Sequence, residues 1–207
     1  MLKVLGQPAS INVRKVLWAC DEIGIAYERE DWGGATRPTS DPAFLALNPN
    51  GLVPVVIDDG LVLRESNTII RYLANKHGRD DLLPQSAATR AQVEMWMDWQ
   101  ATEFNSSWRY AVQALVRKNP NFQDSDQIDA SIKSWAKHVQ ILDRQLATTG
   151  AFVAGSEFSA ADIPMGLSVN RWFMTPLDHP TFEAVAAYYE RLSHRPAFMK
   201  HGRNGVA

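Results

Sequence analysis

Ser10 and Asn12 are the first side chains in this sequence whose types and spacing could do chemistry. Ser10 stands between a short apolar run at 2–5 and a stretch of helical spacing that begins at Ile11, and Asn12 lies in the first turn of that stretch. A serine nucleophile needs a base, and no histidine lies near Ser10 in the sequence. A hydroxyl at the start of a helix is better suited to donating a hydrogen bond, so Ser10 could stabilise a thiolate with help from the helix dipole. The alternative is that Ser10 only caps the helix.

A second feature is the dipeptide Val53-Pro54, which enters an apolar run. Proline cannot donate to a strand ladder, so this one is expected at a sheet edge or at a bend. If the bond between the two residues is cis, the turn exposes the backbone N–H and C=O of Val53, and an extended peptide could pair with them. The alternative is an ordinary proline at a sheet edge.

A third feature is the pair Glu65-Ser66, which directly follows one expected strand and begins an expected helix. A helix N-terminus offers free N–H groups and the positive end of a dipole. Ser66 could therefore hold a carboxylate, while Glu65 could hold an ammonium group. Together they suit the head group of an amino acid. The alternative is that Ser66 only caps the helix.

The elements that must position these residues follow the order β-α-β-α-β-β-α over the first 78 residues. No convincing strand follows, and the rest of the chain shows helical spacing. We therefore expect an α/β domain at 1–78, a linker at 79–87 and an all-helical domain at 88–207. The expected helices are 11–23, 42–47, 65–77, 89–118, 126–146, one from 159, 181–193 and one from 196.

Composition excludes several classes of protein. The chain has 207 residues, with 21 Lys plus Arg against 23 Asp plus Glu and a net charge of −2, which argues against a nucleic-acid partner. No apolar run approaches the roughly 18 residues of a membrane span, so we expect a cytoplasmic protein. The single cysteine, Cys20, excludes an internal disulfide. The five histidines show no metal-ligand spacing, so no metal is expected.

The three features and the element order resemble the glutathione S-transferase family, whose first domain is thioredoxin-like. The segment Ser159–Asp162, preceded by 152–155, resembles that family's capping box and hydrophobic staple, which makes Asp162 a folding residue. No tyrosine precedes Tyr27, and Cys20 lies well inside the first helix. The resemblance is therefore to the Ser/Asn-type, theta-like bacterial transferases.

The resemblance implies that glutathione is the co-substrate and lies extended along the first domain. Its cysteinyl backbone would pair with Val53 beside Pro54, its γ-glutamyl carboxylate would meet Ser66, and its amine would meet Glu65. Its thiol would face the start of the first helix, where Ser10 or Asn12 would donate to the thiolate. We favour Ser10, and the choice stays open at this point.

The chain departs from many relatives at Leu52, where they carry a lysine that holds the glycyl carboxylate. Arg37 and Asn50 are the candidate replacements. Several relatives also recruit a residue of the partner subunit near the γ-glutamyl group, and Thr102 and Asp98 lie in the expected helix for this role. A homodimer is implied by the resemblance alone.

The electrophile would bind between the domains, as the resemblance implies. One helical face carries several candidates for this site, because their spacing of three to four residues places them on the same side. They are Asn105, Trp108, Arg109 and Val112, with Trp172 from a later helix. Trp108 and Val112 could equally be core residues, and Arg109 could equally form a salt bridge.

The sequence thus predicts a glutathione transferase that conjugates the glutathione thiolate to small hydrophobic electrophiles in detoxification. Two alternatives remain open. The same site could serve a glutathione-dependent peroxidase, disulfide reductase or dehalogenase, or the chain could be a non-catalytic transferase-like binding or assembly protein.

Overall fold

The computed structural model describes residues 1–207, which divide into two compact units, Met1–Pro84 and Gln85–Ala207. The division falls inside the stretch predicted as a linker. Residues 79–84 belong to the first unit, because Leu82 and Leu83 are buried and Arg79 donates to the backbone oxygen of Glu22 at 2.5 Å.

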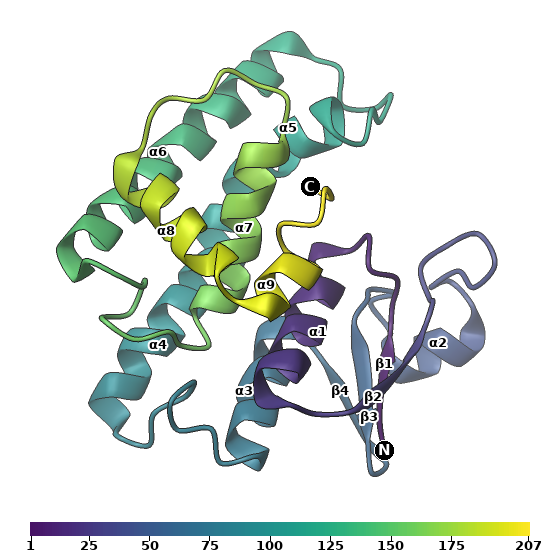
Figure 1. The fold of residues 1–207 in the computed structure, drawn as a ribbon. Helices are drawn as coiled ribbons and strands as arrows, with labels where there is room; N and C mark the ends of the chain where they lie inside the picture. Colours follow the sequence, from purple (N-terminus) through teal and green to yellow (C-terminus); the bar gives the residue numbers. More distant parts are fainter. The chain divides into compact units, whose positions relative to one another are not determined.

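The first unit contains one four-stranded sheet with three helices (Figure 1). The strands lie in the order β2-β1-β3-β4, with β1 and β2 parallel and the other two pairs antiparallel. The observed order βαβαββα and the mixed α/β class confirm the fold that the sequence predicts. The elements are β1 Leu2–Leu5, α1 Ile11–Ile23, β2 Tyr27–Glu30, α2 Pro42–Leu47, β3 Val55–Asp58, β4 Leu61–Arg64 and α3 Ser66–Lys76.

Alternating apolar residues give the sheet two buried faces, since successive side chains of a strand point to opposite sides. On one face Val4 and Val56 pack with apolar residues of α1 and α3, such as Val16 and Ile69. On the other face Leu5 and Val55 pack with a different helix, through Phe44 of α2. Figure 1 shows α1 and α3 side by side on one face and α2 on the other.

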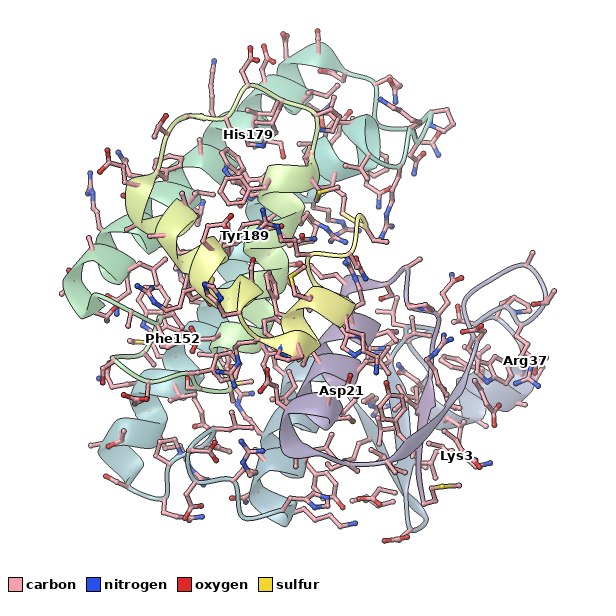
Figure 2. The ribbon with its side chains drawn as sticks, in the orientation of Figure 1. Lys3, Asp21, Arg37, Phe152, His179 and Tyr189 are labelled. Atoms are coloured by element: carbon pink, nitrogen blue, oxygen red, sulfur yellow. The ribbon has the colours of Figure 1, made fainter.

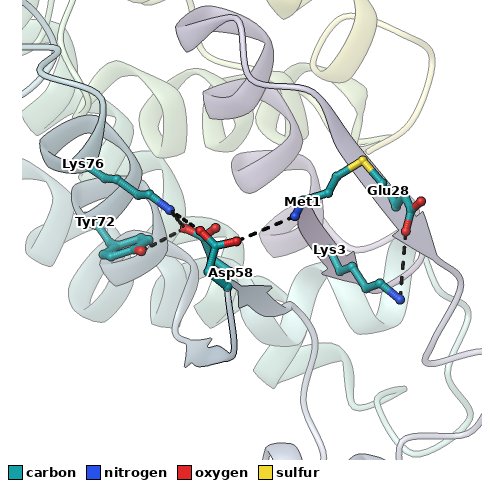
Figure 3. Close-up of polar contacts among 7 residues, drawn as sticks. Met1, Lys3, Glu28, Asp58, Tyr72 and Lys76 are labelled. Atoms are coloured by element: carbon teal, nitrogen blue, oxygen red, sulfur yellow. Dashed lines mark hydrogen bonds and ion pairs between the residues drawn. The ribbon is translucent and has the colours of Figure 1, made fainter.

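A polar cluster ties α3 to the end of β3 (Figure 3). Asp58 accepts hydrogen bonds from Lys76 Nζ at 2.6 Å and from the Tyr72 hydroxyl at 2.8 Å. The hydrogen bond from Lys76 lowers the pKa of the buried Asp58 carboxyl. Lys3 and Glu28 add a bridge of 3.9 Å across β1 and β2, which is exposed and contributes little to stability.

The second unit is helical apart from an isolated bridge between Phe152 and Gly155. Helix α7 is its central helix, because residues 162–172 are all buried. None of the helices combines the length and the apolar character that crossing a membrane requires. The helices are α4 Ala87–Trp99, a π-helical segment at Gln100–Phe104, α5 Asn105–Leu115, α6 Ser125–Thr149, α7 Asp162–Met174, α8 Glu183–Ser193 and α9 Pro196–His201.

The prediction of one regular helix over 89–118 is wrong in detail. The chain is helical from Ala87 to Leu115, but the five residues 100–104 are π-helical, and the helix ends before Pro120 is reached. A π-helical turn adds one residue to a single turn of an α-helix and requires no particular residue types. The sequence periodicity therefore does not reveal it.

The capping predicted for Asp162 is observed. Its carboxylate accepts hydrogen bonds from the backbone N–H of Ser159 at 2.8 Å and of Val153 at 2.9 Å. The Tyr188 hydroxyl donates a further hydrogen bond at 3.0 Å. Asp162 is fully buried, so these donors replace the water that it loses, and its role is structural.

Candidate functional site

The sheet register brings the three predicted motifs to one edge of the first unit. Leu5 at the end of β1 is paired with Val55 at the start of β3, and Val55 is paired with Arg64 at the end of β4. The segment with Ser10 follows β1, Pro54 precedes β3, and Glu65-Ser66 follow β4. Helices α1 and α3 therefore both begin at this edge, and their N-termini make it favourable for anionic groups.

Ser10 is the N-cap residue of α1, with extended backbone dihedrals, but its side chain makes no capping hydrogen bond. Its backbone oxygen accepts from the Arg14 N–H at 3.0 Å, as the first bond of the helix. The side chain is half-buried. The alternative in which the Ser10 hydroxyl only caps the helix is therefore not what the structure adopts.

Gly6 sets how closely the segment before Ser10 approaches the loop before β3. A Cβ at Gly6 would lie 2.4 Å from Val13 Cγ2 and 3.0 Å from Val53 Cβ, and the backbone φ there is +147°. Only glycine fits this approach without a shift of the neighbouring side chains.

The peptide bond between Val53 and Pro54 is cis. The loop before it is held by Asn48, whose side chain is buried. The Asn48 amide donates to the backbone oxygen of Leu52 at 2.7 Å, and its side-chain oxygen accepts from the backbone N–H of Asn50 at 3.1 Å. Sequence reasoning missed this residue. The available signal was the run Asn-Pro-Asn-Gly at 48–51, since asparagine commonly bonds to the backbone within turns.

Glu65 is the N-cap residue of α3 and has a backbone φ of 67°, which is uncommon for a residue other than glycine. The Glu65 side chain makes no capping hydrogen bond and is exposed. Strained backbone of this kind occurs often at functional sites. Glu65 thus presents a free carboxylate at the edge where both helices begin.

Ser66 is the first residue of α3, and its side chain is only 8% exposed. Its hydroxyl donates to Asn12 Oδ1 at 3.4 Å. The structure therefore joins Asn12 and Ser66, which the sequence assigned to two different groups of the ligand, the thiol and the γ-glutamyl carboxylate. That contact was not predicted.

The two candidates for the glycyl carboxylate are Arg37 and Asn50. Arg37 donates to Glu30 Oε2 at 2.7 Å, and its guanidinium lies 5.5 Å from the ring centroid of Trp32. It lies on the loop beside α2, as Figure 2 shows. Asn50 is exposed, and Leu52 is 62% exposed. Arg37 would have to share its charge between Glu30 and a ligand.

The structure separates the predicted electrophile residues into two groups. Trp108 and Trp172 are both buried and both contact Trp135, with ring centroids 6.1 Å and 5.0 Å away. The Arg171 guanidinium lies 4.6 Å from the ring centroid of Trp108. Val112 is also buried, whereas Asn105 is half-buried and Arg109 is exposed. The helical face predicted over 105–112 thus runs from the core to the surface.

Cys20 lies in the core of the first unit as a free cysteine. Burial, with a smaller contribution from Asp21, raises the pKa of its thiol to about 12. A thiol of this kind is not a nucleophile near neutral pH. No group of three or more His, Cys, Asp or Glu residues is placed to hold a metal ion.

Comparison with known proteins gives consistent matches. Residues 5–81 match the family model for the glutathione S-transferase N-terminal domain. Glutathione S-transferase GstB of Escherichia coli is 37% identical over 97% of both chains, and glutathione S-transferase 3 of Zea mays is 31% identical over 96% of this chain and 92% of its own. A theta class glutathione S-transferase from Xanthomonas axonopodis pv. citri, with glutathione bound, has a TM-score of 0.92 at 36% identity, covering 100% of this chain and 99% of the other. This chain belongs to the glutathione S-transferase family.

Proposed function

We propose that this enzyme conjugates the thiolate of glutathione to small hydrophobic electrophiles, with Ser10 as the residue that stabilises the thiolate. The observation that carries the proposal is the position of Ser10. Its hydroxyl stands at the N-terminus of α1 and is not used to cap the helix, so it can donate to a sulfur placed there. Two relatives of this chain carry the name glutathione S-transferase, which supports the same activity.

The rest of glutathione would lie along the edge where α1 and α3 begin. The γ-glutamyl carboxylate would bind at the N-terminus of α3 through Ser66, and the exposed Glu65 would hold the amine. The cysteinyl backbone would pair with Val53, next to Pro54. This arrangement needs no metal ion and no other cofactor.

The remaining assignments concern the glycyl carboxylate of glutathione and the electrophile. Arg37 and Asn50 are proposed for the glycyl carboxylate in place of the lysine that Leu52 replaces. For the electrophile we retain the predicted set, in which the exposed Arg109 and the half-buried Asn105 could meet a polar group of the ligand without displacing core packing. The set is Asn105, Trp108, Arg109, Val112 and Trp172.

The thiol pKa of bound glutathione tests the role of Ser10. A free thiol of pKa about 8.5 is mostly protonated at neutral pH. A hydrogen bond to the thiolate contributes about 1.5–3 kcal/mol, which corresponds to a pKa lowered by about one to two units. Titration of thiolate absorbance in the enzyme–glutathione complex should show this shift, and Ser10→Ala should lose most of it. If Ser10→Ala keeps the full shift, Ser10 is not the donor.

A homodimer and a cytoplasmic location belong to the same proposal. The support for dimerisation is membership of the family together with exposed apolar side chains on α4 and β4, namely Met95, Leu61 and Val62. Sedimentation equilibrium of the purified chain would measure the mass directly, and a monomer at micromolar concentration would contradict the dimer.

A further inference from the structure

The contact between Asn12 and Ser66 links the first turns of α1 and α3. Ser66 Oγ lies 3.4 Å from Asn12 Oδ1 and donates its hydrogen to it. Ser66 is buried and Asn12 is half-buried, so few water molecules can compete for this hydrogen bond. The two helices pack side by side and begin at the same end of the strands (Figure 1). This packing holds the Asn12 and Ser66 side chains together.

A serine hydroxyl has one hydrogen and two lone pairs, so it cannot give its hydrogen to two acceptors at once. When the Ser66 hydroxyl donates to Asn12, it has no hydrogen left for a carboxylate, and only the backbone N–H groups of the helix N-terminus remain as donors. The asparagine side chain can resolve this conflict, because it carries an oxygen that accepts and an NH₂ group that donates. Turning that amide by half a rotation would present the NH₂ group to Ser66 Oγ and free the hydroxyl hydrogen.

We propose that Asn12 is a positioning residue that holds the Ser66 hydroxyl and releases its hydrogen to the γ-glutamyl carboxylate of glutathione. The inference rests on the proposed function. Without ligand, Asn12 Oδ1 accepts from Ser66. With the carboxylate in place, the Ser66 hydrogen turns to it, and the Asn12 NH₂ group donates to Ser66 Oγ. Asn12 therefore sets the affinity for the glutamyl end of glutathione, while Ser10 acts on the thiol.

Binding of glutathione to wild type, Asn12→Ala and Asn12→Asp tests this assignment by calorimetry. Asn12→Ala should weaken glutathione binding about fivefold, because the hydrogen bond between Asn12 and Ser66 exists with and without ligand but is stronger when Ser66 donates onward to a charged carboxylate. Asn12→Asp should weaken it further, because a carboxylate only accepts, keeps the Ser66 hydrogen and repels the ligand's carboxylate. The thiol pKa of bound glutathione should be the same in wild type and Asn12→Ala. Thr68→Ala, an exposed position on α3, is the matched control and should bind as wild type does.

A second ligand separates a positioning role from general loss of structure. 4-Aminobutyryl-cysteinyl-glycine differs from glutathione only in lacking the γ-glutamyl carboxylate. Its affinity should be equal for wild type and Asn12→Ala. In a double-mutant cycle, Asn12→Ala should add nothing to the loss caused by Ser66→Ala, because Asn12 acts through Ser66.

Several outcomes would overturn the inference. Glutathione affinity could be unchanged in Asn12→Ala, the loss could be equal for the two ligands, or Asn12→Ala could raise the thiol pKa as Ser10→Ala does. Each of these outcomes leaves the proposed function intact, because wild type still binds glutathione. Failure of wild type itself to bind glutathione would instead overturn the proposed function, and the role of Asn12 with it.

Discussion

At the scale of single residues, Glu65 combines an uncommon backbone conformation with an exposed carboxylate. A positive φ costs a residue with a Cβ on the order of 1 kcal/mol, whereas glycine adopts it freely. Glycine also makes the unfolded chain more flexible, which offsets part of this gain. A glutamate at this position is therefore explained by its carboxylate and not by its backbone.

We expect Glu65→Gly to be at least as stable as Glu65→Ala, because alanine keeps the unfavourable φ and glycine relieves it. Both variants should bind glutathione at least tenfold more weakly, since each removes the charged partner of the ligand's amine. Thermal unfolding measures the first effect and calorimetry the second. A glycine variant that unfolds below the alanine variant would show that the positive φ at Glu65 costs less than the flexibility glycine adds to the unfolded chain.

At the scale of elements, the loop between α2 and β3 depends on Asn48. Its buried amide contacts the backbone of both Leu52 and Asn50. Asn48→Ala should destabilise the chain by about 1–3 kcal/mol, because it removes two hydrogen bonds that each contribute about 0.5–1.5 kcal/mol. It should also weaken glutathione binding, because the same loop carries Val53. Denaturant unfolding and calorimetry on one sample would check both effects.

The control for this prediction is Asn50→Ala, which removes an exposed side chain while the Asn50 backbone N–H still donates to Asn48. Its stability should stay within about 0.5 kcal/mol of wild type. Equal destabilisation by the two substitutions would contradict the structural role given to Asn48.

Local patterns in the sequence predict most of the elements, and the structure places the three predicted motifs at one edge of the first unit. Helix 11–23 was predicted with the bounds observed, because its apolar spacing is regular and Gly24 ends it in the left-handed conformation. The π-helical turn at 100–104 and the contact between Asn12 and Ser66 were not predicted. The contact depends on how two distant segments meet, since 54 positions separate Asn12 from Ser66, and the periodicity of the helix does not reveal the π-helical turn. The roles of the site residues in binding and catalysis stay predictions.

At the scale of the whole molecule, the two units contain carboxyl groups whose pKa values shift in opposite directions. In the first unit, the hydrogen bond from Lys76 lowers the pKa of Asp58, so its contribution to stability is lost as the pH falls below the usual aspartate range. In the second unit, burial raises the pKa of Asp162 to about 6. The folded chain therefore binds a proton at Asp162 more tightly than the unfolded chain does, between pH about 4 and about 6.

This difference predicts that the free energy of unfolding decreases as the pH rises from about 4 to about 6. A shift of about two pKa units corresponds to roughly 3 kcal/mol, all of it present below the unfolded pKa and lost above the folded one. Urea unfolding at a series of pH values, followed by circular dichroism, would measure the slope.

Tyr188→Phe removes a donor that stabilises the charged carboxylate, so it should move the decrease to higher pH. Asp162→Asn cannot titrate and should abolish the decrease, because the remaining shifted aspartates, including Asp58, act at lower pH. A stability that rises with pH across this window in wild type would show that the hydrogen bonds to the Asp162 carboxylate outweigh the cost of burying its charge. These come from the Val153 and Ser159 N–H groups and from the Ser159 and Tyr188 hydroxyls.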